Sequence, residues 1–173
     1  MKQRLISGDN HIDLTACPPD LWSSAAPAKW KLLAPRVEEL EDGLHWFVEA
    51  QDKGMWNGVG PTFFKYTKGV YGHIDEMKDL GFEWDNQAGA KPRPTTPELR
   101  LADLDRDGVD AEIVYGCLTI NEMIGNQQIR AWANTVYNDW VADFAKRADP
   151  NRIFPLAIIP NHYPEEAAAE VRR

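Results

Sequence analysis

Short apolar runs and one long amphipathic stretch alternate along the second half of the chain. The runs 111–115 and 153–159 are almost wholly apolar and predict strands buried on both faces. Between them, residues 126–148 repeat apolar side chains every three or four positions, which predicts a helix with one buried face. The expected stripe consists of Ile129, Trp132, Val136, Trp140 and Phe144, with Ala133, Tyr137 and Val141 beside it.

Helix boundary signals frame two further helices. Thr96 supplies an N-cap hydroxyl before Pro97, and Gly108 suits a C-terminal cap, so a helix is predicted between them. Pro164 opens a last helix that runs into Arg173.

A first strand precedes these elements. Residues 4–7 are largely apolar and stop at the turn-forming residues 8–10, which predicts a buried strand that ends in a polar loop. Strands alternating with helices in this way predict an α/β fold with a parallel sheet and right-handed crossovers.

Residues 15–95 do not follow this pattern. They hold five of the seven tryptophans and most of the glycines and prolines, without a sustained period. We expect loops, short helices and a hairpin across 44–50 and 54–59. Loops this long inside a compact domain are usually lids or binding segments.

Composition and charge narrow the function classes. The 173 residues are 43% apolar and 27% charged, typical of one globular domain. A net charge of −8 without a basic block disfavours nucleic acid and anionic membrane surfaces as partners. No signal-like or membrane-spanning apolar run is present, and two cysteines are too few for a disulfide framework. We therefore expect a soluble, cytoplasmic protein.

Asp9 and His11 are the main candidates for chemistry. They stand two positions apart after the first predicted strand, and functional side chains of parallel α/β folds gather at the carboxyl ends of strands. If the extended conformation continues, both side chains point the same way. A carboxylate and an imidazole on one side suit a divalent metal such as Zn²⁺. The alternative is a turn at Asp9 and Asn10 with a solvated His11.

Other candidates are weaker. His162 follows the third predicted strand, where it either contacts substrate or only leads the last helix. Cys117 lacks a neighbouring base and is not expected to act as a nucleophile. His73 has no second histidine four residues away and is interpreted as a loop residue.

Residues 103–108 match the first half of a calcium-binding loop. The twelfth position of such a loop must supply a bidentate Glu, but Val114 stands there. The end of a helix capped by Gly108 explains the same residues, so calcium binding is not predicted.

Four stretches carry a family resemblance. Residues 7–11 and 18–22 are similar to the opening of amidohydrolase-related proteins, in the branch of aminocarboxymuconate-semialdehyde decarboxylase-like enzymes. Residues 100–111, and residues 137–140 followed by 149–153, resemble the same group. Together they cover the chain in the right order.

The resemblance implies a metal-dependent (β/α)₈ barrel whose first strand ends in two metal ligands. These would be Asp9 and His11, holding a divalent ion, Zn²⁺ before Mn²⁺ or Mg²⁺. Family members take further ligands, a His and an Asp, from later strands that this chain lacks. Because such a barrel needs about 250 residues, we interpret residues 1–173 as its N-terminal part. A lid over 15–95 would precede regular β/α units over 96–173.

Two functional hypotheses follow from the resemblance. The first is a metal-dependent hydrolase or non-oxidative decarboxylase acting on a small organic acid, ring or amide. The alternative is a truncated or partner-dependent fragment with no catalytic activity of its own, which would pair with a second copy or a complementing chain. An unrelated small α/β binding domain is a third interpretation, against which stands the missing phosphate-loop motif.

Overall fold

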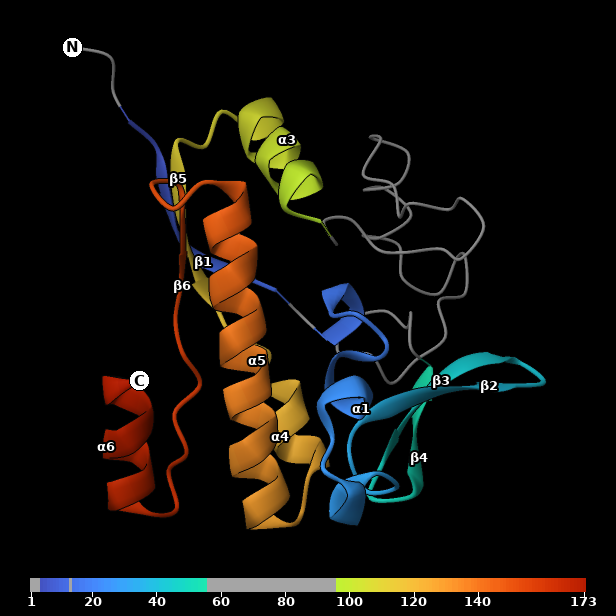
Figure 1. Cartoon of the computed structure of the whole chain (residues 1–173). Helices are drawn as coiled ribbons and strands as arrows, with labels where there is room; N and C mark the ends of the chain where they lie inside the picture. The colour runs from blue at the N-terminus through green and yellow to red at the C-terminus, as the bar shows by residue number, and fades with distance from the viewer. Residues whose placement is uncertain (1–3, 13, 56–95) are drawn as a thin grey trace.

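A three-stranded parallel sheet forms the centre of the computed structural model, which describes residues 4–12, 14–55 and 96–173 (Figure 1). Its strands are β1 (Ile6–His11), β5 (Ala111–Tyr115) and β6 (Ile153–Pro155), in the order β1-β5-β6. All pairings are parallel. The predicted α/β fold with a parallel sheet is confirmed.

Helix α5 (Gln127–Ala148) packs against the sheet, and α3 (Pro97–Asp107) and α4 (Thr119–Met123) pack against α5 (Figure 1). Helix α6 (Pro164–Arg172) is joined to α5 by hydrogen bonds of its Glu170 side chain. Helix α3 begins and ends as predicted, because the Thr96 hydroxyl accepts from the Leu99 amide and Gly108 has a left-handed φ of 70°. Helix α5 begins at an Asn126 cap. The short α4 was not predicted.

The buried face of α5 is rotated from the predicted stripe. Trp132, Val136 and Trp140 are only partly buried, while two asparagines lie inside with the apolar residues. The buried set is Ile129, Ala133, Asn134, Tyr137, Asn138, Val141, Phe144 and Ala145. The prediction is confirmed for Ile129, Ala133, Tyr137, Val141 and Phe144. It was wrong for the two tryptophans and Val136 and missed the asparagines, because it ranked positions by hydrophobicity, whereas a polar side chain is stable in the core when it is hydrogen-bonded.

The two faces of the parallel sheet differ. Glu112, Val114 and Ile153 point to the helices and are fully buried. On the opposite face, Ile6 and Phe154 are exposed. We call this opposite side the open face. The prediction of strands covered on both faces is therefore wrong for the described part of the chain.

Two strand boundaries also differ from prediction. β1 covers Ile6–His11 instead of 4–7, so residues 8–10 belong to the strand. The third strand stops at Pro155, because its neighbour β5 ends at Tyr115 and offers one last bond, from the Leu156 amide to the Val114 carbonyl at 2.8 Å. Beyond it, the Asn138 side chain replaces a partner strand by bonding both the amide and the carbonyl of Ile158.

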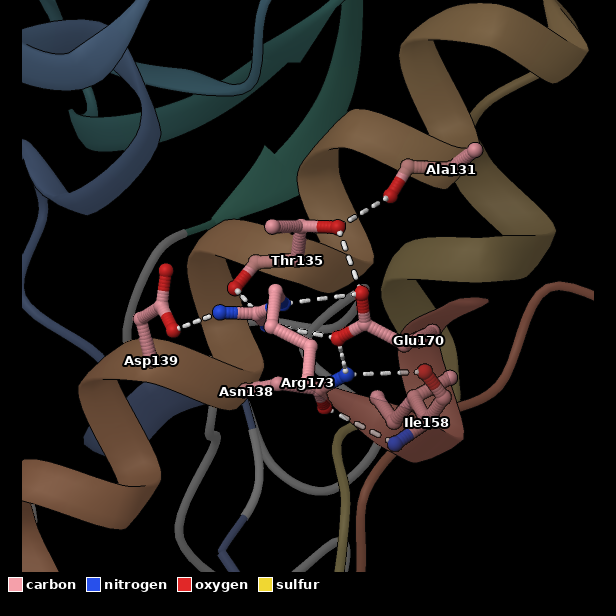
Figure 2. A network of polar contacts seen from close by, with 7 residues as sticks. All are labelled: Ala131, Thr135, Asn138, Asp139, Ile158, Glu170 and Arg173. Carbon is pink, nitrogen blue, oxygen red and sulfur yellow. Dashed lines mark hydrogen bonds and ion pairs between the residues drawn. The ribbon is translucent and has the colours of Figure 1, made fainter. Parts of the chain in front are cut away.

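A polar network fixes the segment after β6 and helix α6 against α5 (Figure 2). Glu170 on α6 accepts hydrogen bonds from Asn138 (2.8 Å) and Thr135 (3.2 Å) of α5. Arg173 pairs with Glu170 at 2.6 Å and also with Asp139. These contacts determine where the chain between β6 and α6 lies, including His162.

A second, antiparallel sheet lies beside α1, away from the parallel sheet (Figure 1). The preceding short helices are η1 (Leu14–Ala16), α1 (Leu21–Ala25) and η2 (Ala28–Trp30), and the strands are β2 (Arg36–Leu40), β3 (Gly43–Val48) and β4 (Gln51–Met55). The hairpin predicted from 44–50 to 54–59 is displaced, since β3 turns into β4 at Glu49 and Ala50. Both turn residues have left-handed φ angles, 52° and 61°. Residues 56–95 of the expected lid lie outside the described residues.

Candidate functional site

A bulge in β1 determines which way the candidate metal ligands point. Ser7 pairs with Glu112 and Asn10 with Val114, so β1 uses one residue more than β5 over this stretch. Glu112 and Val114 face the helices, and Ser7 and Asn10 therefore face them too. The extra residue shifts the alternation of side chains along β1, so that Asp9 and His11 both point to the open face. In a regular strand, both would point into the helix side.

A buried ion pair anchors this register. The Glu112 carboxylate is 0% exposed and accepts two bonds from Arg100 of α3, from Nε at 2.7 Å and from Nη2 at 2.6 Å. The Asn10 amide donates to the same carboxylate. The buried Glu112 carboxylate thus joins β1, β5 and α3, and we infer that it fixes the position of the bulge.

The chain that leaves β1 is held at several further points. The His11 carbonyl accepts a long bond from Arg100 Nη1 at 3.4 Å. The Ile12 amide donates to the Tyr115 carbonyl, and the Tyr137 hydroxyl donates to the Ile12 carbonyl, each at 3.4 Å. The carboxyl end of β1 is therefore fixed by contacts from α3, β5 and α5.

Asp9 and His11 lie together on the open face, as the Asp-x-His spacing predicts. His11 Nε2 is 3.6 Å from Asp9 Oδ1, with the side chains 46% and 91% exposed. The His11 ring stacks on Tyr115, with 5.6 Å between ring centroids and 24° between planes. The turn expected in the alternative interpretation is not observed, because Asp9 and Asn10 belong to β1, but the His11 side chain is partly exposed to solvent as that interpretation expects.

The donor set fits part of a metal site. A carboxylate oxygen and an imidazole nitrogen are ligands that Zn²⁺ and related divalent ions accept. The described residues contain no group of three or more His, Cys, Asp or Glu side chains that could hold a metal ion. Asp9 and His11 can thus supply two ligands, and water or residues outside the described ones would complete the coordination shell.

A pocket of about 400 Å³ lies at the carboxyl ends of β5 and β6 and contains His162. Tyr115, which stacks on His11, forms part of its wall. Arg130 of α5 donates from Nη1 to His162 Nε2 at 3.0 Å, and its Nε and Nη2 both donate to the Ile124 carbonyl. Since a guanidinium only donates, His162 Nε2 is the acceptor and Nδ1 carries the proton.

Sequence reasoning missed several residues that shape these sites. Glu112 interrupts an otherwise apolar run, and Asn134 and Asn138 sit four apart on an apolar helix face. A charged or amide group at such positions is the signal that could have identified them, because buried polar groups need partners. The partners themselves come from distant segments.

The weaker candidates have different outcomes. Cys117 is fully buried and unpaired by a disulfide. Residues 103–107 lie in α3 with Gly108 as the cap, as predicted. His73 lies outside the described residues.

No helix in the described part of the chain has the length and apolar character needed to cross a membrane.

The parallel sheet of β1, β5 and β6 and the helices between its strands form an α/β arrangement that a solved structure shares. A crystal structure of an amidohydrolase from Mycobacterium avium subsp. paratuberculosis K-10 matches 99% of this chain with a TM-score of 0.67 and 15% sequence identity. The chain spans 46% of the length of that protein. No protein-family model and no curated protein matches the chain. At this identity the likeness establishes the fold alone.

Proposed function

We propose that this chain contributes the first two ligands of a divalent-metal centre in an amidohydrolase-related enzyme. The enzyme would be a hydrolase or a non-oxidative decarboxylase acting on a small organic acid, ring or amide. The observation that carries the proposal is the β1 bulge, which turns Asp9 and His11 together onto the open face.

A bound divalent ion lowers the pKa of a water ligand or polarises a carbonyl or carboxylate. Asp9 would bind it through a carboxylate oxygen and His11 through Nε2, the nitrogen that already faces Asp9. Tyr115 holds the imidazole by stacking, and the Arg100–Glu112 pair holds the strand beneath it. These contacts support a preorganised ligand pair, since metal-binding imidazoles need an orientation fixed by their neighbours.

The finer parts of the proposal rest on the sequence resemblance. Residues 7–11 and 18–22 are similar to decarboxylase-like members of the amidohydrolase-related group. Zn²⁺ is the ion we favour before Mn²⁺ or Mg²⁺, because a mixed carboxylate and imidazole donor set is common for zinc. We also propose that residues 15–95 cover the substrate.

Metal binding provides the test. The chain is dialysed against Zn²⁺ or Co²⁺, and bound metal is measured by mass spectrometry and by the visible spectrum of Co²⁺. We expect Asp9→Asn and His11→Ala each to lower the affinity by about tenfold or more, which is the effect of losing an orienting or coordinating group. Asp20→Asn is the matched control, because Asp20 is exposed and its side chain makes no cap bond. Equal metal binding by all four proteins would refute the proposal.

Activity separates the two reactions. Release of CO₂ from a carboxylated substrate identifies a decarboxylase, and hydrolysis of an amide or cyclic amide identifies a hydrolase. If Asp9→Ala combined with His11→Ala leaves both metal content and turnover intact, the assignment is wrong.

A further inference from the structure

We infer that Glu49 is a positioning residue for His162, the candidate substrate contact in the pocket at the carboxyl ends of β5 and β6. The antiparallel sheet that carries Glu49 would thereby determine which ring nitrogen of His162 holds the proton. None of the contacts that support the inference involves Asp9 or His11, so it goes beyond the proposed metal centre and does not rest on it.

The Glu49 side chain reaches from the antiparallel sheet to the start of α5. Its two carboxylate oxygens accept hydrogen bonds from the Gly125 amide at 3.1 Å and from the Asn126 amide at 2.7 Å. Asn126 is the N-cap of α5, so the carboxylate also lies at the positive end of the helix dipole. Hydrogen bonds from backbone amides to a carboxylate are charge-assisted and therefore stronger than those between neutral groups.

The backbone of the β3–β4 turn holds Glu49 in an unfavourable conformation. Glu49 and Ala50 both have left-handed φ angles, although neither residue is glycine. The Glu49 amide donates to the Leu33 carbonyl at 2.9 Å, which fixes the turn against the segment before β2. Backbone strain that the surrounding structure maintains indicates a functional role, and we assign that role to the placement of the carboxylate at α5.

A single peptide unit joins this contact to Arg130. The Gly125 N–H, which donates to Glu49, and the Ile124 C=O belong to the same planar trans peptide and therefore point in opposite directions. Arg130 donates to that carbonyl from Nε, at 2.8 Å, and from Nη2. The peptide thus has an anion at its N–H end and a cation at its C=O end. Each charge polarises the peptide in the sense that strengthens the bond at the other end.

The third nitrogen of the guanidinium reaches the pocket. Arg130 Nη1 donates to His162 Nε2 at 3.0 Å, which places the proton of a neutral His162 on Nδ1. Because the guanidinium is planar and rigid, its bonds to the Ile124 carbonyl also fix the direction of Nη1. The orientation of the Ile124–Gly125 peptide therefore determines the tautomer of His162, and Glu49 holds that peptide.

Gly125 permits the contact with Glu49 and also allows the peptide to rotate. A Cβ at position 125 would lie 3.1 Å from Glu49 Oε2, closer than ordinary van der Waals contact. Glycine adopts left-handed φ angles as readily as right-handed ones. Without Glu49, the Ile124–Gly125 peptide can therefore rotate and direct its carbonyl away from Arg130.

The test measures the tautomer of His162 by NMR. The full 173-residue chain, isotopically labelled, is studied in EDTA at alkaline pH, where imidazoles are neutral. Long-range proton–nitrogen correlations report which ring nitrogen is protonated, and the His162 signals are those that disappear in His162→Gln. In the wild type we expect the Nδ1–H tautomer to exceed the Nε2–H tautomer by about tenfold, as for a hydrogen bond from a charged donor.

Two variants disturb the contact from opposite sides. Glu49→Ala removes the carboxylate, whereas Gly125→Ala keeps the carboxylate and displaces it through the added Cβ. In both we expect the preference for Nδ1–H to fall to about threefold or less, and the Arg130 Nε proton to exchange faster with water. Glu39→Ala is the matched control and should keep the wild-type ratio, because Glu39 is an exposed carboxylate on β2 of the same sheet.

A second control separates positioning from a general loss of stability. Asp52 accepts from the Gly54 amide at 2.8 Å and bonds His45 Nδ1 at 2.9 Å, both within the antiparallel sheet. Asp52→Asn should therefore lower the Tm while it leaves Glu49 in place. We expect the tautomer of His162 to remain as in the wild type.

Three results would overturn the inference. They are a His162 tautomer unchanged in Gly125→Ala or in folded Glu49→Ala, the same change in Asp52→Asn, and a changed tautomer with unaltered exchange at Arg130 Nε. If Glu49→Ala does not fold, Gly125→Ala decides, because it keeps the charge. Since EDTA removes divalent ions, the result is independent of metal binding by Asp9 and His11, and the two proposals can fail separately.

Discussion

Replacing Arg100 with Met should destabilise the protein far more than the loss of an arginine from a surface ion pair. Glu112 is fully buried and depends on Arg100, itself only 11% exposed, for two of its hydrogen bonds. The substitution removes both and leaves a buried carboxylate with the Asn10 side-chain amide as its remaining hydrogen-bond donor among the described residues. A buried pair broken in this way costs about 3–5 kcal/mol.

The loss can be measured as a change in the free energy of unfolding in urea. For a chain of this size, about 2–4 °C of Tm accompanies each kcal/mol, so a fall of roughly 6–20 °C is expected. Arg147→Met is the matched control, because Arg147 makes a surface ion pair with Asp143. Pairs of that kind are worth about 0–1 kcal/mol.

The double variant Arg100→Met with Glu112→Leu distinguishes the buried charge from lost packing. Replacing both partners by apolar groups removes the uncompensated carboxylate, so the double variant should be more stable than Arg100→Met alone. Additive losses in the double-mutant cycle, or a cost for Arg100→Met below about 1 kcal/mol, would refute the reasoning.

Two further predictions concern the turn between β3 and β4 and the α5–α6 contact. Ala50→Gly should stabilise the protein by roughly 1 kcal/mol, because Ala50 is exposed with a φ of 61° that glycine adopts without strain; an unchanged urea midpoint would contradict this. Arg173, and then Asn138, hold the pKa of Glu170 below its ordinary value of 4.5. The stabilisation from ionised Glu170 is therefore present above that ordinary value and is lost as pH falls through the lowered one. The stability difference between the wild type and Glu170→Gln should shrink as pH falls from 6 to 3, and a constant difference would count against the pair.

Local signals were sufficient for most of the second half of the fold. The hydroxyl of Thr96, the ring of Pro97 and the backbone freedom of Gly108 act within a few residues of themselves, so the bounds of α3 could be predicted. The ends of helix α5 could also be predicted from nearby residues. Its buried face could not, because Asn138 is buried through its hydrogen bonds to Ile158 and Glu170, which come from segments 20 and 32 residues away.

Only part of the candidate site could be predicted, because one of its features depends on neighbouring residues and another depends on a distant strand. Alternation along an extended chain correctly placed Asp9 and His11 on one side. Which side of the sheet they occupy depends on the register between β1 and β5, and nothing in residues 7–10 alone specifies that register.

The extra residue in β1 also affects how related chains should be recognised. A protein that keeps every residue from Ser7 to His11 but pairs its first strand in a regular register would place the equivalent of Asp9 opposite Val114, and both Asp-x-His side chains would point into the helix layer. Residue identity would score it as a match, although it could not bind a metal on the open face. Transfer of the ligand pair to another scaffold must therefore reproduce the register that places Asn10 opposite Val114, together with its Asn, Glu and Arg anchors.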